Sequence, residues 1–77
     1  MDLNDIIVGR MIRKLRRDKD ISQAQLAEAL RMQQNVISRV EIGKRPVALG
    51  ELRALCKFLG VTLGEFVRDY EARAETN

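Results

Sequence analysis

A short stretch near the middle of the chain, Met32-Gln-Gln-Asn-Val-Ile-Ser-Arg39, gathers amide and hydroxyl side chains beside an arginine and contains no acid. Gln, Asn and Arg can form paired hydrogen bonds with the edges of DNA bases. Catalysis is not indicated, because the sequence has no histidine, no glycine-rich phosphate loop and no suitably separated pair of acids. The stretch therefore predicts a binding surface, and we expect no enzymatic activity.

Positive charge is concentrated in the same part of the chain. Residues 10–45 hold ten Lys or Arg against four Asp or Glu, whereas the net charge of the whole chain is only +3. This asymmetry is typical of a protein that binds a polyanion, although charge alone does not separate DNA from RNA or from an anionic membrane. A module that binds only proteins would explain neither the charge nor the acid-free surface.

Length and composition set further bounds. A chain of 77 residues forms one small domain, and its 45% apolar and 32% charged residues are typical of a globular protein. No apolar run is long enough to span a membrane and no secretory signal is recognisable, so we expect a cytoplasmic protein without a membrane partner. One cysteine and no histidine provide neither a disulfide nor the usual zinc site, so we expect no metal and no cofactor.

The spacing of the apolar residues predicts an all-α protein, a compact bundle of five helices. The helices are expected over about residues 2–18, 22–30, 33–42, 49–59 and 62–71. Residues 1–71 would form the domain and residues 72–77 a short frayed tail.

Local signals mark several ends of these helices. Ser22 with Gln25 and Thr62 with Glu65 fit the capping box that opens a helix. Cys56 falls among the inward-facing residues of the fourth helix, where a lone cysteine behaves as a small apolar residue. The other expected inward-facing residues are Ile7, Val8, Met11, Ile12, Leu15, Leu26, Ala27, Leu30, Ile37, Val40, Leu52, Leu55 and Leu59.

Residues 22–42 combine two short helices and a tight turn, the helix-turn-helix unit whose second helix lies in the DNA major groove. Ile37 and Val40 mark the inner side of that second helix, at about residues 33–42, and a period of 3.6 residues defines the opposite side. The expected base-contacting residues on that side are Gln34, Asn35, Ser38 and Arg39. Val36 could meet a thymine methyl or close the core, and both readings stay open.

Two stretches, Ser22-Gln-Ala-Gln-Leu-Ala-Glu28 and Val36-Ile-Ser-Arg-Val-Glu-Ile-Gly-Lys-Arg45, resemble the Cro and repressor (Xre-like) family of transcription regulators. Leu59-Gly-Val-Thr-Leu-Gly-Glu-Phe66 is similar to the end of that domain, so the resemblance covers about residues 9–67. It implies a regulator, expected to be a repressor, that binds double-stranded DNA sequence-specifically.

Three residues depart from the family pattern. Arg31 stands at the turn where the family often has glycine, and a positive φ there would cost about 1 kcal/mol. Gln33 stands where a Ser or Thr usually caps the recognition helix, and Pro46 comes one residue early. These departures concern the geometry of the turns more than the fold.

The resemblance also assigns roles outside the reading surface. Gln23 is expected at a phosphate, at the start of a helix whose dipole favours anions. Arg16 and Glu41 are expected to form a partly buried ion pair between the first and third helices. Further contacts with the DNA backbone are expected from Gln33, Lys44, Arg45 and Arg13, although Arg13, like Arg10, could simply be solvated.

A single recognition helix contacts few base pairs, so we expect a homodimer on a palindromic operator. The candidate interface residues are Phe66, Val67 and Tyr70, followed by Leu49; closing the monomer's own core is the alternative, above all for Phe66. Three uses of the fold stay open: a stand-alone repressor, a restriction-modification controller, and an antitoxin whose partner would be its toxin. The stand-alone regulator is placed first, because an antitoxin usually needs more chain to hold its toxin.

Overall fold

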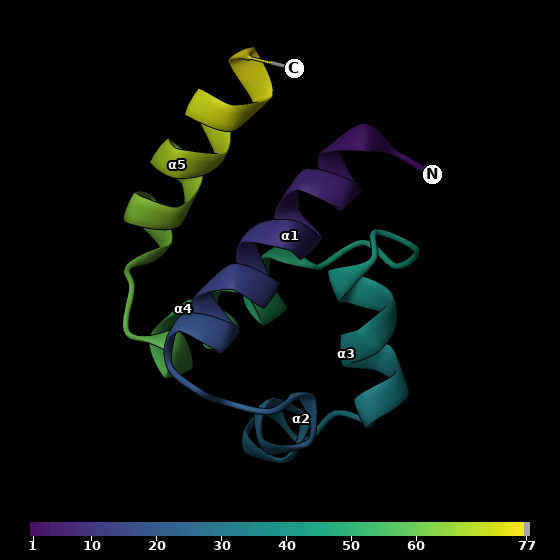
Figure 1. Ribbon diagram of the computed structural model, residues 1–77. Helices are drawn as coiled ribbons and strands as arrows, with labels where there is room; N and C mark the ends of the chain where they lie inside the picture. Colours follow the sequence, from purple (N-terminus) through teal and green to yellow (C-terminus); the bar gives the residue numbers. More distant parts are fainter. Residues whose placement is uncertain (77) are drawn as a thin grey trace.

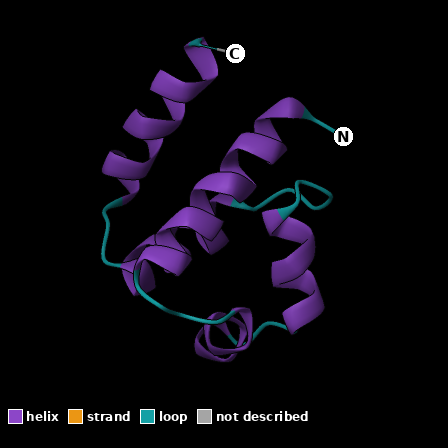
Figure 2. Cartoon of the chain, in the orientation of Figure 1, coloured by secondary structure: helices purple, strands orange, loops and turns teal. Residues whose placement is uncertain are grey.

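The computed structural model describes residues 1–76 and confirms the all-α class (Figure 1). The helices are α1 Leu3–Asp18, α2 Gln23–Leu30, α3 Gln34–Glu41, α4 Leu49–Leu59 and α5 Leu63–Glu75. Turns and loops join them, and residues 1–76 contain no strand (Figure 2). Within this part of the chain, no helix combines the length and the apolar character needed to cross a membrane.

Helix α1 is the centre of the arrangement. It contacts α3, α4 and α5, whereas α2 packs against α3 and α4. In Figure 1, α1 runs between α5 on one side and α3 on the other, and α2 is seen nearly end-on below them. Of the helix-turn-helix pair, α3 therefore packs directly on α1, whereas α2 is held by α3 and α4.

The two capping boxes expected from the sequence are present. Ser22 Oγ accepts a hydrogen bond from the backbone N–H of Gln25 at 3.0 Å, and Gln25 Oε1 accepts one from the N–H of Ser22 at 2.8 Å. Thr62 and Glu65 repeat the arrangement at 3.0 and 2.9 Å. The hydrogen bonds from Thr62 hold the pKa of the Glu65 carboxyl below its usual value. These reciprocal bonds fix where α2 and α5 begin.

The turns between the helices use left-handed residues, as the sequence suggested. Arg31 ends α2 with φ at 54°, in the left-handed region. An arginine therefore adopts the conformation for which the family often has glycine. Gly43 follows α3 with φ at 80°, and a Cβ there would lie 2.9 Å from the Cα of Ile6. Glycine is required at position 43 both by its backbone angle and by the close approach of α1.

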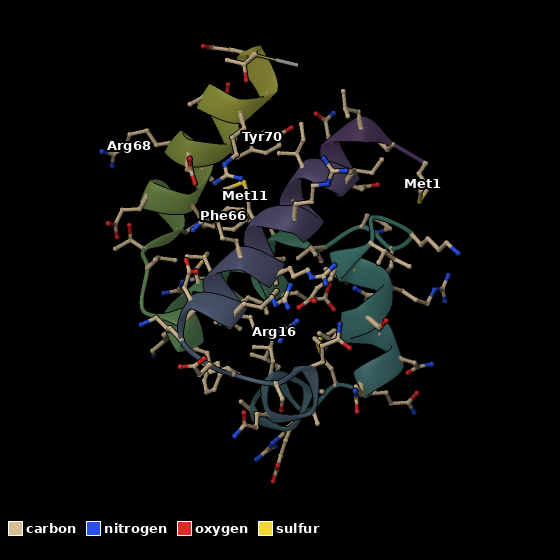
Figure 3. All side chains as sticks on the ribbon, in the orientation of Figure 1. Met1, Met11, Arg16, Phe66, Arg68 and Tyr70 are labelled. Atoms are coloured by element: carbon tan, nitrogen blue, oxygen red, sulfur yellow. The ribbon has the colours of Figure 1, made fainter. Side chains whose placement is uncertain are left out.

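The core contains the inward-facing residues expected from the sequence. The least exposed side chains come from all of α1 to α4, and α5 adds Phe66, which lies with Met11 between α5 and α1 (Figure 3). Cys56 is buried at 1% exposure, and the burial raises the pKa of its thiol. The fully buried residues are Ile12, Leu26, Ile37, Leu59 and Cys56.

The C-terminal end differs from the prediction of a frayed tail over residues 72–77. Helix α5 continues through Glu75, and Ala74 packs against the core. Thr76 Oγ1 donates a hydrogen bond to the carbonyl of Arg73 at 2.9 Å, which satisfies one of the last free carbonyl groups. Residues 72–75 are therefore helical, and residue 77 of the expected tail lies outside the described residues.

Two helical glycines make a test of the packing between α1 and α3. A Cβ at Gly9 would collide with the carbonyl oxygen of Val40 and lie 2.8 Å from that of Glu41, whereas a Cβ at Gly50 would meet nothing within 4 Å. We expect Gly9→Ala to lower the free energy of unfolding by about 3 kcal/mol, the upper part of the usual range for overpacking, because backbone cannot yield as a side chain does. Gly50→Ala should raise it by about 0.5–1 kcal/mol. Urea denaturation measures both, and a well-tolerated Gly9→Ala would show that α1 and α3 are not packed this closely.

Candidate nucleic-acid interface

The ion pair expected between Arg16 and Glu41 is present and lies at the junction of α1, α2 and α3. Arg16 Nε donates to Glu41 Oε2 at 2.6 Å and Arg16 Nη2 donates to Oε1 at 2.9 Å. Arg16 Nη1 donates to the backbone carbonyl of Ile21 at 2.7 Å. Gln23 Nε2 completes the cluster by donating to Glu41 Oε1 at 3.0 Å. Figure 3 shows Arg16 between α1 and the helix-turn-helix pair.

This cluster is buried, so its geometry is held firmly. Glu41 is 3% exposed and Arg16 is 9% exposed. The hydrogen bond to Glu41 raises the pKa of the Arg16 guanidinium above its usual value, against the opposing effect of desolvation. Because the two carboxylate oxygens of Glu41 receive three donors from α1 and α2, the end of α3 cannot shift without breaking several charge-assisted hydrogen bonds. The cluster therefore fixes the orientation of the recognition helix.

The polar residues of α3 face away from the core. Ile37 and Val40 are 1% and 2% exposed on the inner side. On the opposite side, Gln34, Asn35 and Arg39 are exposed and Ser38 is half-buried. None of these four side chains takes part in a hydrogen bond or ion pair among the interactions found within residues 1–76. Their donors and acceptors are available to an external partner.

Ile42 belongs to the same surface, although sequence reasoning did not single it out. It follows α3 directly, is 46% exposed, and lies four residues after Ser38 and seven after Asn35. This spacing puts it on the side of the helix that carries the polar residues. The helical period used to select the reading residues would have found it, had apolar residues been included. Val36 is half-buried, which is compatible both with contact to a thymine methyl and with closing the core.

The expected phosphate-contacting residues fall into two groups. Lys44, Arg13 and Gln33 are exposed, and α3 begins without a side-chain cap from Gln33. Arg45 instead forms a bidentate pair with Glu51 at 3.1 and 3.0 Å. Arg45 holds the pKa of the Glu51 carboxyl below its usual value, with help from the backbone N–H that this carboxyl accepts at the start of α4.

Arg45 and Gln23, two of the residues expected at phosphates, are already bonded to carboxylates within the protein. Arg45 braces the loop between α3 and α4, and its guanidinium would have to share its donors to reach DNA. Gln23 commits one amide hydrogen to Glu41, which leaves its second amide hydrogen for a phosphate. Both residues therefore have a structural role besides any contact with DNA. Their hydrogen bonds to Glu41 and Glu51 could not be inferred from the neighbouring sequence.

The residues expected at a dimer interface are not equivalent in the structure. Phe66 is 3% exposed and closes the monomer's own core, the alternative left open by the sequence, so it is not available at a surface. The Tyr70 hydroxyl donates to Asn4 Oδ1 at 2.8 Å, which joins α5 to α1. Val67 and Leu49 are 41% and 70% exposed. Val67 and Leu49 remain candidates for contact with a second copy.

The fold and the free polar surface of α3 define a helix-turn-helix DNA-binding regulator. Residues 12–66 match the helix-turn-helix family, and the chain belongs to this family. The resemblance to the Cro and repressor (Xre-like) regulators, first noted from the residues of α2 and α3, is thereby confirmed.

Three proteins that are similar to this chain are regulators or control proteins by name. Control protein C.MunI from Mycoplasma sp is 38% identical over 72 residues, which are 90% of this chain and 97% of that protein. Among solved structures, the restriction-modification controller protein C.AhdI from Aeromonas hydrophila is 28% identical with a TM-score of 0.79, covering 84% of this chain and 98% of that one. The clp gene regulator ClgR from Corynebacterium glutamicum is 27% identical with a TM-score of 0.83, covering 92% and 91%.

The buried cluster predicts a large difference between two ion pairs of α1. Arg16→Met leaves the Glu41 carboxylate buried without its main partner, so we expect the free energy of unfolding to fall by about 3–5 kcal/mol. Lys14→Met removes a solvent-exposed pair with Asp18, and the loss should stay below about 1 kcal/mol. Chemical denaturation measures both variants. Equal losses would mean that the buried pair does not hold α1 to α3.

Proposed function

We propose that this protein is a controller of a restriction-modification system, a transcription regulator that binds a palindromic operator as a homodimer with α3 in the major groove. The observation that carries the DNA-binding part of the proposal is the row of polar side chains on the outer side of α3, which have no partner within residues 1–76 and are held in place by the buried Arg16–Glu41 pair. A recognition helix needs free donors and acceptors, because any hydrogen bond within the protein would compete with the bases.

The residues on α3 suit particular base edges. Gln34 and Asn35 can each bond the N6 and N7 atoms of adenine, and Arg39 can bond O6 and N7 of guanine. Ser38 is half-buried and short, so it reaches a nearby base or phosphate only. Lys44, just beyond the end of α3, is exposed and binds a phosphate at the edge of the groove. Base contacts thus come from the helix and positioning contacts from its surroundings.

A dimer supplies the selectivity that one helix lacks. Two α3 helices related by a two-fold axis read half-sites about one DNA turn apart, and the total number of specific contacts doubles. Leu49 and Val67 are the exposed apolar residues offered to the second copy.

The relatives favour the controller over the other two uses of the fold. C.MunI, which is named a control protein, aligns with nearly the whole of both chains, so the similarity is not restricted to the helix-turn-helix unit. C.AhdI, a restriction-modification controller by name, shares the fold at a similar length. ClgR, a clp gene regulator, supports regulation of transcription by the same fold. Repression is the expected outcome where the operator overlaps a promoter.

The deciding experiment is selection of binding sequences from random duplexes with the purified protein, followed by sedimentation of the complex with the selected site. A palindromic consensus and a stoichiometry of two chains per duplex are expected. A reporter promoter that overlaps the selected site should be repressed when the protein is expressed. Failure to enrich any sequence at low ionic strength would refute the proposal.

Arg39 is the sharpest test of the reading surface. Arg39→Ala should relax the preference at one base pair per half-site by about 1–3 kcal/mol while leaving the other positions unchanged. Arg53→Ala, which removes an exposed arginine from α4, is the matched control and should leave the consensus intact. Binding measured against a panel of single-base variants of the operator decides the point. A full consensus in Arg39→Ala would place the reading surface elsewhere.

Lys44 tests the contacts with the DNA backbone. Lys44→Ala should weaken binding to all sequences alike, and the slope of log affinity against log salt should become shallower by about one unit. Lys57→Ala removes a lysine that is also exposed, from α4, and should leave the slope unchanged. Titrations over a range of salt concentrations give both slopes, and identical slopes for wild type and Lys44→Ala would remove Lys44 from the interface.

A further inference from the structure

The outward face of α1 carries a row of cations that the reading surface does not account for. At 3.6 residues per turn, Arg13, Arg17, Arg10 and Lys14 fall within an arc of about 100° around the helix axis. All four side chains are exposed. Together with Asp18 they enclose a shallow hollow of about 390 Å³ on the surface.

Most of this charge is not neutralised within the molecule. Lys14 Nζ forms an ion pair with Asp18 at 2.9 Å, four residues along the helix. By contrast, the side chains of Arg10, Arg13 and Arg17 make no hydrogen bond or ion pair in the part of the chain that the structure describes. We call these three residues the arginine row. Three neighbouring guanidinium groups without a carboxylate repel one another and favour an anionic partner.

The arginine row is continuous with the end of the recognition helix. A second hollow, of about 290 Å³, is lined by Met1, Ile6, Arg10, Arg13, Glu41 and Ile42. Arg10 and Arg13 therefore border both hollows, and the second one reaches Ile42, which shares a face with the polar residues of α3. An anion that lies along the edge of the reading surface can pass directly onto the arginine row.

We propose that the arginine row binds the sugar–phosphate backbone of the same duplex that α3 reads, so that Arg10 and Arg17 extend the phosphate contact expected for Arg13. This inference rests on the proposed function. The row spans about 10.5 Å along α1, from a rise of 1.5 Å per residue. One strand of DNA carries a phosphate about every 3.4 Å of its axis, so a row of this length can lie beside several phosphates. The apolar side chains of Met1 and Ile42 beside it suit a deoxyribose.

An acidic protein surface is the rival partner, and the structure favours DNA. The row adjoins the surface that carries the free base-reading side chains, so a duplex held there already brings phosphates close to Arg13. Guanidinium groups are also well suited to phosphate, which they bind through two parallel hydrogen bonds.

The test is a double variant, Arg10→Gln with Arg17→Gln, assayed on the operator obtained by selection. We expect the slope of log affinity against log salt to become shallower by about two units, one for each lost phosphate contact. Sequence preference should stay the same, because neither residue reaches a base. Ethylation of individual phosphates should interfere with wild-type binding at positions that no longer matter to the double variant.

Two further variants serve as controls. Arg53→Gln with Arg68→Gln removes the same charge from α4 and α5, and Figure 3 shows Arg68 pointing away from α1. This control should keep the wild-type slope and ethylation pattern. Arg10→Lys with Arg17→Lys keeps the charge and should recover most of the slope. Thermal melting of each variant establishes that it is folded, which is expected because all the substituted side chains are exposed.

The outcomes separate this inference from the proposed function. A wild type that selects an operator, together with an Arg10→Gln, Arg17→Gln variant whose slope and ethylation pattern are unchanged, overturns the role of the arginine row and leaves the proposed function intact. The same holds if the charge control lowers the slope equally, since the effect would then be net charge alone. A wild type that binds no duplex overturns both.

Discussion

The contact between Arg16 and Glu41 is the constraint on which the use of this fold depends. A buried carboxylate requires a full set of donors, and Glu41 receives them from α1 through Arg16 and from α2 through Gln23. The three helices are thus joined at one point by directional bonds, where apolar packing alone would allow them to slide. Since Glu41 is the last residue of α3, the orientation of the recognition helix is set at its C-terminal end.

The same constraint divides the cations of a basic protein into two kinds. Arg16 and Arg45 are held by Glu41 and Glu51, and they fix α3 and the loop that follows it. Arg39 and Lys44 are exposed and keep their donors for an external partner. Glu41 and Glu51 are used in internal pairs, whereas Arg39 and Lys44 have no carboxylate partner among the described residues. The paired arginines thus hold the helices in place, and the exposed cations provide the surface that can bind a polyanion.

Most of the fold could be predicted from the sequence because its signals are local. The capping boxes at Ser22 and Thr62, the left-handed residue at Gly43 and the apolar spacing within each helix involve partners at most four residues apart. The prediction that Gln34 and Arg39 lie on the exposed side of α3 is confirmed for the same reason, since the inward positions of one short helix determine its outward ones. Arg31 stands where the family often has glycine, and it still adopts the positive φ of the left-handed region.

The amino-acid sequence by itself thus determined the five helices, the class of protein and the polar face of α3. Only the tertiary structure decided that Gln23 bonds Glu41, that Phe66 is buried in the monomer and that Tyr70 bonds Asn4. The physical reason is sequence separation: Gln23 and Glu41 are 18 residues apart, and Tyr70 and Asn4 are 66 apart. Helical periodicity says which side of a helix is buried, but which neighbour it meets depends on how all the helices pack at once.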